Sequence, residues 1–468
     1  MKLIFSLILV LIPISSFSYI GDSYDCKMKS FIGIDTDGIP KKWKEQRFSF
    51  KWKDDFTIQF GKGGYFDDFT SERIGWFSAH KDSFNIHHDI YIMNYQFDLG
   101  EQLKINNSKN YTEFFIEKSN NNLNVIDLFC GCGGLSLGFQ RAGYNILAGL
   151  DIDETALKTY SHNLKTLGLN IDLSNSLFVN EVKKKIKGKK IDVLVGGPPC
   201  QGFSLTGTRI LNDPRNSLFK SFFQSIDVFK PKIVLLENVK GINTLYGGVV
   251  IKEIISEFEI RGYNTNYSLL NASDFGVPQN RERFFIIASK TNNKIMMPEE
   301  KLSNEFKITC EDAISDLHDF QNSIGEEESQ YQYKPSNFYQ KLMRLKATKL
   351  LNHVGTAHKQ FVIDTIRLVP DGGNHKDLPE GVGVSRKFNE AWTRYNSKKP
   401  SKTIDTGHRN HFHYKFNRVP TVRENARLQS FPDDFKFIGS KTNQNKQVGN
   451  AVPVFLSQAI AAHIKSYL

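Results

Sequence analysis

Apolar and polar residues alternate in two different ways along the chain, and the change of pattern divides the sequence into zones. Residues 19–118 contain aromatic segments with a two-residue period, such as FSFKW at 48–52, and glycine-rich turns such as GKGG at 61–64. This pattern predicts a small antiparallel β-rich domain, to which we assign no chemistry. The polar stretch KSNNN at 118–122 is typical of a linker.

From residue 123 to about 288, short apolar strands alternate with longer amphipathic helices. Such alternation indicates an α/β fold with a Rossmann-like, mixed but mostly parallel sheet, and ligands then bind at the carboxyl ends of the strands. The expected strands cover 125–129, 146–150, 191–195 and 232–236, and the expected helices cover 134–142 and 154–163. Residues from about 300 to 400 lose this regularity, whereas the chain becomes helical again at Thr421 and ends in a helix over 454–467.

The first residues have the order of a secretory signal: a basic start, an apolar run over 3–13 and small residues at 15–18. A buried first strand is the alternative, and the run is shorter than the roughly 20 residues of a membrane span. The five cysteines include no CxxC pair, which disfavours a disulfide framework and a four-cysteine zinc site. We therefore expect that the protein binds no metal and that its cysteines stay reduced in a reducing compartment. This expectation conflicts with the secretory-signal interpretation of the first residues.

The 468 residues suffice for two or three domains, and their formal net charge is +11 with a pI near 9.1. This excess of Lys and Arg attracts polyanions, so nucleic acid is a reasonable partner, although a basic proteome explains the charge equally well. The lysine-rich run at 183–190 is interpreted as a solvated helix end rather than a specific DNA contact.

A glycine-rich turn, CGCGG at 130–134, follows the first expected strand of the α/β region. Glycines there let the backbone approach a ligand closely. Asp151 ends the second strand, where an acid commonly binds ribose hydroxyls. Alone, this pattern would suggest a dinucleotide enzyme, but Ser136 occupies the third position of G-x-G-x-x-G, so the signal is weak.

A more specific signal is GGPPCQGFS at 196–204, which directly follows a strand. It places Cys200 at a strand's carboxyl end, on a turn stiffened by two prolines, where a thiolate could act as a nucleophile. A buried structural cysteine is the alternative. Glu237 ends another strand and thus lies on the same rim, and the charged segment QNRER at 279–283 enters an apolar strand.

These blocks resemble the bacterial DNA (cytosine-5) methyltransferase family over about residues 123–290 and 400–468. The matching blocks are DLFCGCGG at 127–134, PPC at 198–200, ENV at 237–239, QNRER at 279–283, RENARLQSFP at 423–432 and QVGNAVP at 447–453. The resemblance implies an S-adenosylmethionine-dependent methyltransferase fold and methyl transfer to carbon 5 of cytosine, within a specific short sequence of double-stranded DNA, on a base flipped out of the duplex.

The resemblance also implies residue roles. Cys200 would attack carbon 6, Glu237 would hold or protonate N3, Arg283 would contact the base oxygen, and Arg281 would support the same pocket. The implied cofactor-binding residues are Asp127, Phe129, Gly131, Gly133, Asp151, Ile152, Pro199, Asn216, Leu218 and Asn450. The family's usual adenine-binding aspartate has no clear counterpart, so Asp172, Asn175 and Ser176 stay open for that contact.

The resulting domain prediction has five parts. They are a signal-like segment (1–18), a β-rich accessory domain (19–118), a catalytic domain (123–299), a target-recognition region (300–420) and a C-terminal return to the catalytic domain (421–468). We expect a cytoplasmic, nucleoid-associated monomer that binds no metal and whose catalytic part is not attached to a membrane. A restriction endonuclease that acts separately could be its cognate partner.

Three other interpretations are weaker. A tRNA cytosine-5 methyltransferase shares the Pro-Pro-Cys chemistry, but its Cys-Phe-Thr signature is not found and the turn continues as Gln201-Gly202. A dinucleotide-dependent oxidoreductase does not explain Cys200, Glu237 and Arg283 on one rim. A secreted, catalytically idle protein would explain only the N-terminus, which we interpret as an unusual fusion or a misplaced gene start.

Overall fold

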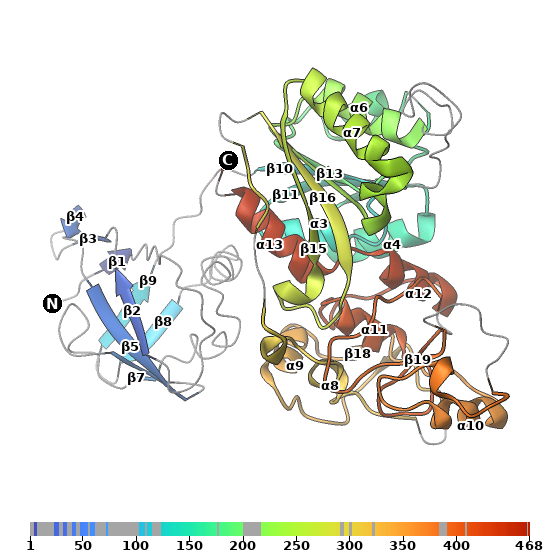
Figure 1. The fold of residues 1–468 in the computed structure, drawn as a ribbon. Coiled ribbons are helices and arrows are strands. Elements are labelled where there is room, and N and C mark those ends of the chain that lie inside the picture. The colour runs from blue at the N-terminus through green and yellow to red at the C-terminus, as the bar shows by residue number, and fades with distance from the viewer. Residues whose placement is uncertain are drawn as a thin grey trace. The chain divides into compact units, whose positions relative to one another are not determined.

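The computed structural model describes residues 123–468 except for short gaps, and describes only strands in residues 1–122. The gaps are 176, 200–216, 291–293, 299–301, 321–322, 383–390, 408–409 and 466. The chain divides into two compact units, Met1–Asn122 and Leu123–Leu468, at the predicted linker (Figure 1). No helix in the described part of the chain has the length and apolarity needed to cross a membrane.

The described strands of the first unit pair in an antiparallel manner, as the two-residue period predicts. They are β1 (Ile4–Ser6), β2 (Ser23–Lys27), β3 (Phe31–Ile34), β4 (Pro40–Trp43), β5 (Arg47–Asp54), β6 (Thr57–Phe60), β7 (Glu72–Arg73), β8 (Leu103–Asn107) and β9 (Asn110–Phe114). Strand β1 lies inside the apolar run and pairs with β3, which fits the first-strand alternative and does not support the signal-like interpretation.

The second unit contains the predicted mixed, mostly parallel sheet, with strand order β12-β11-β10-β13-β14-β16-β15. The strands are β10 (Asn124–Leu128), β11 (Asn145–Asp151), β12 (Leu167–Asn170), β13 (Val193–Gly196), β14 (Ile233–Val239), β15 (Asn264–Asn271) and β16 (Glu282–Ser289). Strands β10 to β14 are parallel, whereas β16 runs antiparallel between β14 and β15. The start of β16 therefore lies at the same edge as the ends of the parallel strands.

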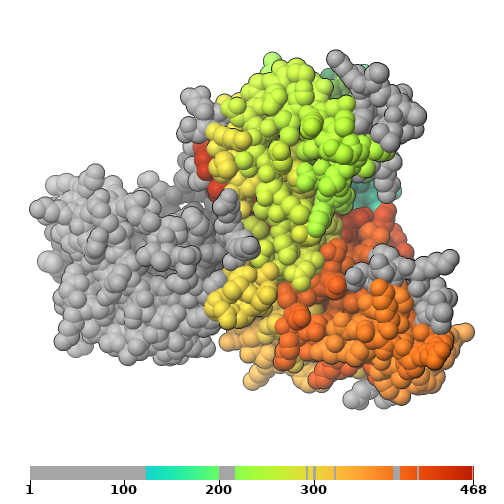
Figure 2. Space-filling model, viewed as in Figure 1, coloured from blue at the N-terminus to red at the C-terminus, as the bar shows by residue number. Residues whose placement is uncertain are grey.

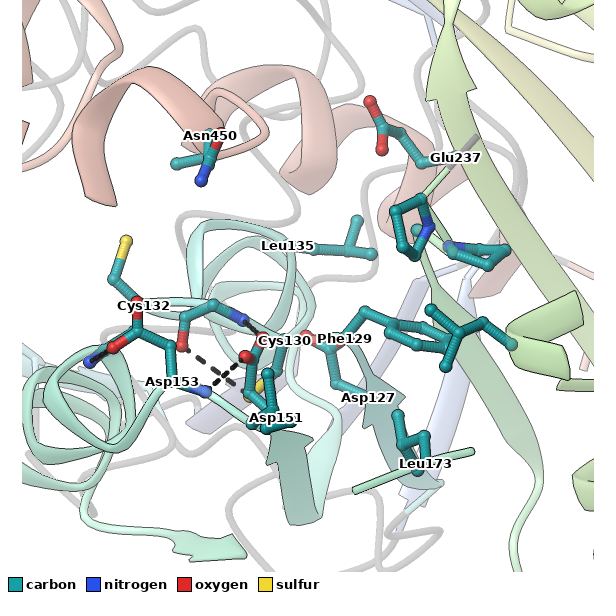
Figure 3. A pocket seen from close by; sticks show the side chains of 18 of the residues that line it. Asp127, Phe129, Cys130, Cys132, Leu135, Asp151, Asp153, Leu173, Glu237 and Asn450 are labelled. Carbon is teal, nitrogen blue, oxygen red and sulfur yellow. Dashed lines mark hydrogen bonds between the residues drawn. The ribbon is translucent and has the colours of Figure 1, made fainter. Parts of the chain in front are cut away.

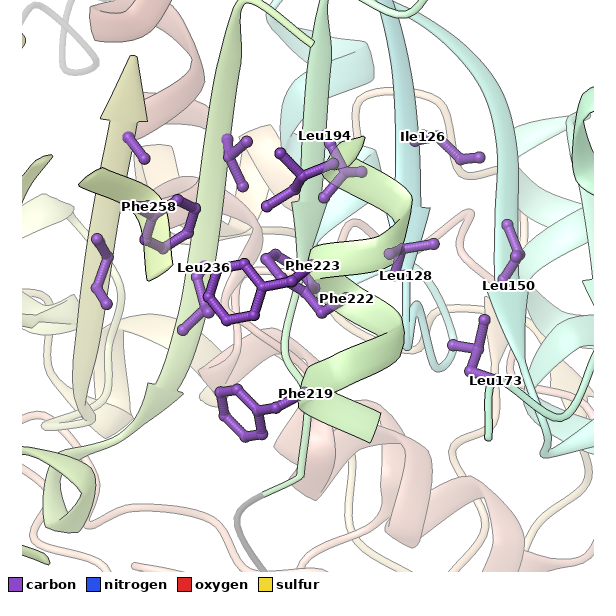
Figure 4. Close-up of a cluster of buried hydrophobic side chains, with 14 of the residues drawn as sticks. Ile126, Leu128, Leu150, Leu173, Leu194, Phe219, Phe222, Phe223, Leu236 and Phe258 are labelled. Atoms are coloured by element: carbon purple, nitrogen blue, oxygen red, sulfur yellow. The ribbon is translucent and has the colours of Figure 1, made fainter. Parts of the chain in front are cut away.

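Helices cover both faces of this sheet. One face carries α3 (Gly134–Arg141), α4 (Glu154–Leu164) and α13 (Val454–Lys465), and the other carries α5 (Phe178–Lys185), α6 (Ser217–Phe229) and α7 (Val249–Ile260). Phenylalanines of α6 and α7 pack on alternate strand residues such as Leu194 and Leu236, which forms the main core (Figure 4). The lysine-rich run begins in the last turn of α5, where the exposed Lys183, Lys184 and Lys185 complement the helix dipole, and its remaining lysines follow the helix and are also exposed, as the solvated-end interpretation predicts.

Residues between the sheet and the C-terminal helices form a second lobe with little regular structure, as their composition predicts (Figures 1 and 2). It contains α8 (Cys310–Ile314), α9 (Phe338–Met343), α10 (Gln360–Leu368), β17 (Glu328–Ser329), β18 (Leu350–Leu351), β19 (Thr393–Arg394) and β20 (His411–Phe412). Short 3-10 helices are η4 (Lys240–Asn243), η5 (Leu245–Gly248), η6 (Ala272–Phe275), η7 (Asn304–Phe306) and η8 (His375–Asp377).

The chain then returns to the sheet through α11 (Val422–Leu428) and α12 (Lys441–Asn450). A capping box starts α11, because Thr421 accepts a hydrogen bond from the Glu424 amide and Glu424 accepts one from the Thr421 amide. The fully buried Arg427 donates to Asp433, which follows α11, and forms an ion pair with Asp316, which follows α8. Because all three side chains are buried, this pairing ties the second lobe to the returning chain.

The packing of α3 on α13 depends on Gly138, because a Cβ there would lie 2.2 Å from the Oγ and 2.4 Å from the Cβ of Ser457. We expect Gly138→Val to lower the unfolding free energy by about 1–3 kcal/mol through overpacking. Urea and thermal denaturation of the full chain measure this, with Gly241→Val as the control, since no atom lies within 4 Å of a Cβ at Gly241. Equal losses in the two variants would contradict the prediction.

Candidate active site

A pocket of about 790 Å³ lies at the carboxyl edge of the sheet, where β10, β11, β13 and β14 end (Figure 3). It brings together most of the residues that the sequence predicted for the site. Those in its wall are Asp127, Phe129, Gly131, Asp151, Ile152, Pro199, Leu218, Glu237 and Asn450. The pocket is therefore assembled from segments more than 300 residues apart in the chain.

The glycine-rich turn crosses the floor of this pocket in an unusual backbone conformation. Phe129 and Gly131 have positive φ angles of 61° and 53°, which a side-chain-bearing residue such as Phe129 adopts only when its surroundings hold it there. Asp151 holds the turn, because its carboxylate accepts hydrogen bonds from the amides of Gly131 (2.8 Å) and Asp153 (2.9 Å). Asp151 thus positions the turn and also faces the pocket.

Asp127 is almost completely buried at the end of β10 and also lines the pocket. Its Oδ2 accepts a hydrogen bond of 2.6 Å from Ser136, whereas its Oδ1 has no partner among the described residues. Burial raises the pKa of this carboxyl to about 7, and the Ser136 hydrogen bond partly opposes that rise. Asp127 therefore changes its charge near neutral pH.

Glu237 and Arg283 form an ion pair at the other side of the pocket, with 3.1 Å between Glu237 Oε1 and Arg283 Nε. Burial raises the pKa of Glu237, and the positive charges of Arg283 and Arg281 partly offset that rise. Room for this carboxylate depends on Gly197, where an added Cβ would lie 2.7 Å from Glu237 Oε2. Glu237 lines the pocket, whereas Arg283 is not among the lining residues, so the pair presents to the pocket a carboxyl whose charge a neighbouring cation balances.

The turn that leads to Cys200 is anchored beside Glu237, because the Asn238 side chain donates to the Pro198 carbonyl at 2.9 Å. Pro199, the residue before Cys200, lines the pocket. Cys200 itself and Asn216 lie outside the described residues. The last described residues of this turn thus lead the chain along the pocket wall toward the predicted nucleophile.

Arg281 is fully buried and does not line the pocket. Its guanidinium donates to the carbonyl of Ile404 at 3.1 Å and to the carbonyl of Gly449 at 2.7 Å. Gly449 precedes Asn450 of the pocket wall, and Arg283 lies two residues beyond Arg281 on β16. Arg281 therefore links the Glu237–Arg283 side of the pocket to α12 and to the second lobe.

Gly133 is not itself among the residues that line the pocket, although its neighbours Cys132 and Gly134 are, so its role stays a prediction. Gly133 is the N-cap residue of α3 and has a φ of 97°. Because it has no side chain, there is room for the Tyr160 ring, whose Cδ2 would lie 2.8 Å from a Cβ added at Gly133. Of the candidates for the unassigned contact, Asp172 lines the pocket, Asn175 does not, and Ser176 lies outside the described residues.

The sequence interpretation missed several other lining residues. They include Cys130, Cys132, Leu135, Asp153, Leu173, Ser174, Lys446, Gln447, Ala451 and Val452. Cys130 and Cys132 belong to the recognised glycine-rich turn, so their place in that block was an available signal. Lys446 is held by an ion pair with Asp153 of 3.0 Å across 293 residues, a contact that no local pattern indicates.

The family model described as C-5 cytosine-specific DNA methylase matches residues 123–466. The type II methyltransferase M.DdeI of Desulfomicrobium norvegicum is 38% identical over 371 residues, covering 74% of this chain and 89% of the relative. M1.HphI of Haemophilus parahaemolyticus, also a type II methyltransferase, is 37% identical over 342 residues, covering 72% and 86%. A solved E. coli structure described as a prophage-encoded DNA modification methyltransferase is 28% identical with a TM-score of 0.60, covering 74% and 99%.

The Glu237–Arg283 pair predicts a pH-dependent loss of stability in Arg283→Met. In this variant Glu237 has lost its nearest cation, so its pKa in the folded state rises further. The folded state then keeps a proton on Glu237 at pH values above about 4.5, where the unfolded state has released it. Stability should therefore fall as pH rises, with a loss near 3 kcal/mol at pH 8 and a smaller one at pH 5.

Denaturant unfolding of the natural and variant chains at both pH values measures this difference. The double variant Glu237→Gln/Arg283→Met is the control, because it has no carboxyl at position 237 to titrate, so its stability should fall less between pH 5 and pH 8 than that of Arg283→Met. An equal loss at the two pH values in Arg283→Met alone would show that Glu237 does not depend on Arg283.

Proposed function

Because the chain belongs to the C-5 cytosine-specific DNA methylase family, we propose that Cys200 forms the covalent bond to the target cytosine during methyl transfer. The observation that carries this proposal is the convergence of the Pro198-Pro199 turn and Glu237 at one wall of the pocket, where Glu237 is paired with Arg283. The Cys200 thiolate adds to carbon 6, across the double bond between carbon 5 and carbon 6. The ring is thereby converted to an enamine, in which carbon 5 is nucleophilic. Loss of the carbon 5 proton and release of the thiolate complete the cycle.

We assign the stabilisation of the ring to the ion pair. Addition of the thiolate places negative charge on the ring, and a proton held by Glu237 at N3 relieves it. The raised pKa of the buried Glu237 favours the protonated form that this role requires. We assign the hydrogen bond to the neighbouring base oxygen to Arg283, whose Nε lies 3.1 Å from Glu237 Oε1. Arg281 then acts indirectly, by holding β16 and α12 together.

We infer that S-adenosylmethionine binds in the rest of the pocket, where it supplies an electrophilic methyl group on a positively charged sulfur. The volume of about 790 Å³ is within the usual range for small-molecule sites, about 300–1,000 Å³. The residues fit this ligand: Asp151 lies where ribose hydroxyls bind, the Ile152 side chain is 70% exposed and offers an apolar surface, and Asp127 has a free buried oxygen. Asp172 is our candidate for the adenine contact.

We further propose that the second lobe recognises a short double-stranded DNA site and that the enzyme works as a monomer in the cytoplasm. The net charge of +11 supports binding to phosphates, and the relatives' type II names support a role beside a separate restriction endonuclease. Those same DNA methyltransferase relatives favour DNA over the tRNA alternative.

Expression of the full chain in bacteria that lack cytosine methylation tests the reaction. Bisulfite sequencing of the plasmid should find 5-methylcytosine at one short recurring site, and Cys200→Ala should abolish it. Cys310→Ala is the matched control, because Cys310 is a buried free thiol of α8 outside the pocket, and it should retain methylation. Methylation by Cys200→Ala would overturn the mechanism, and methylated tRNA with unmodified plasmid would favour the RNA substrate.

The division into two units predicts that residues 119–468 fold and methylate DNA without the β-rich unit. Circular dichroism, cofactor titration and the same bisulfite map measure this, with the full chain as the reference. We expect the methylated site and the affinity for S-adenosylmethionine to be unchanged. An insoluble or inactive fragment beside an active full chain would instead make the first unit part of the enzyme.

A further inference from the structure

A fully buried tyrosine lies behind the cofactor pocket without contributing to its wall. Tyr160 of α4 has no exposed surface, and its hydroxyl lies 2.9 Å from the Oγ of Ser136 on α3. Ser136 in turn donates to Asp127 Oδ2 at 2.6 Å. When Asp127 is charged, the single Ser136 hydrogen is committed to it, so Tyr160 must donate to Ser136. The three groups therefore form a directional relay that ends on a pocket carboxylate.

The backbone makes room for this ring at two glycines. A Cβ at Gly149 of β11 would lie 2.3 Å from Tyr160 Cζ, and one at Gly133 would lie 2.8 Å from Tyr160 Cδ2. Both glycines belong to segments that continue into the pocket, through Asp151 and through the turn. The ring is thus held in one position between the glycine-rich turn and the sheet, with its hydroxyl aimed at Ser136.

The free oxygen of Asp127 gives the relay a functional consequence. Asp127 is 1% exposed, lines the pocket, and its Oδ1 has no hydrogen-bond partner in the described part of the chain. S-adenosylmethionine carries positive charges on its sulfonium and, when protonated, on its amino group. A charged Asp127 would attract either cation, whereas a protonated Asp127 would not.

The other groups that act on Asp127 oppose its charged form. Asp151 from the end of β11 and Glu237 from β14 both repel a negative charge there, and burial raises its pKa to about 7. The buried Cys130 thiol of the turn is a further neighbour, and α4 contributes Tyr160. Among the groups named for this carboxyl, Ser136 alone favours the charge, first through its hydroxyl, which Tyr160 polarises, and to a smaller extent through its backbone amide.

We propose that the Tyr160–Ser136 relay holds Asp127 in its charged form toward the cofactor, so that Tyr160 is a positioning residue for cofactor binding although it lies outside the pocket. This inference rests on the proposed binding of S-adenosylmethionine. It predicts that loss of one remote hydroxyl changes the pH dependence of cofactor affinity, which a purely structural role of the ring would not do.

The test is a calorimetric titration of the full chain with S-adenosylmethionine from pH 6 to pH 9. Tyr160→Phe should raise the Kd about tenfold near pH 7, because more Asp127 is protonated, and the ratio to the natural chain should approach one at pH 9. The amino group of the ligand titrates identically with every chain, so the ratio of Kd values isolates the protein.

The matched control is Tyr263→Phe, which removes another buried tyrosine hydroxyl, bonded to the Pro231 carbonyl at 2.6 Å and remote from the pocket. It should leave the ratio at one throughout. In an Asp127→Asn background, Tyr160→Phe should have no further effect, because the relay has no charge left to hold. A ratio independent of pH, or an undiminished effect in that background, would overturn the relay.

A ligand-free measurement separates failure of the relay from failure of the cofactor assignment. A higher folded-state pKa of Asp127 in Tyr160→Phe makes stability fall more as pH rises, so this variant should lose more stability at pH 8 than at pH 6. Tyr263→Phe should lose the same at both. A larger loss at pH 8 in Tyr160→Phe, found together with no binding of S-adenosylmethionine, would support the relay but refute the cofactor assignment. Equal losses at pH 6 and pH 8 in Tyr160→Phe would refute the relay itself.

Discussion

The described pocket lining contains five carboxylates, and the repulsion of Asp127 by Asp151 and Glu237 is the constraint to which the rest of the site responds. These three carboxylates have different partners. Asp151 accepts hydrogen bonds from two backbone amides and so shapes the glycine-rich turn, Glu237 is paired with Arg283, and Asp127 accepts hydrogen bonds from Ser136. Burial raises the pKa values of Asp127 and Glu237, and the positive charges of Arg283 and Arg281 partly offset that rise for Glu237.

The antiparallel strand β16 is what supplies the cation. Because it runs against its neighbours, its first residues rather than its last reach the carboxyl edge, and Arg283 lies opposite Val239 of β14. A slip of one residue in this register would turn Arg283 to the other face of the sheet and leave Glu237 unpaired. Arg281, which directly precedes β16, fixes the start of this strand through its hydrogen bonds to the carbonyls of Ile404 and Gly449.

The sheet and much of the site could be predicted from the sequence because their signals are local. Apolar runs that end in glycine or proline turns place Asp127, Asp151 and Glu237 at strand ends without any knowledge of the fold. Three features could not be predicted, since each depends on segments that meet only after folding: the burial of Arg281, the packing of the Tyr160 ring against Gly133 and the ion pair between Lys446 and Asp153. The second lobe stayed undefined for the same reason, because its small apolar cluster joins α10 to Phe412 and Val419, which lie some fifty residues further along the chain.

The pocket wall draws on both ends of the catalytic unit, from Asp127 to Val452, in a chain of 468 residues. Chains fold progressively from the N-terminus during synthesis, so the sheet can form while the wall made by α12 is still missing. The pocket is therefore complete only after α12 and the residues up to Val452 have been synthesised. A chain released before that point carries the predicted nucleophile but no complete pocket, so most of the catalytic unit must leave the ribosome before any base can be modified.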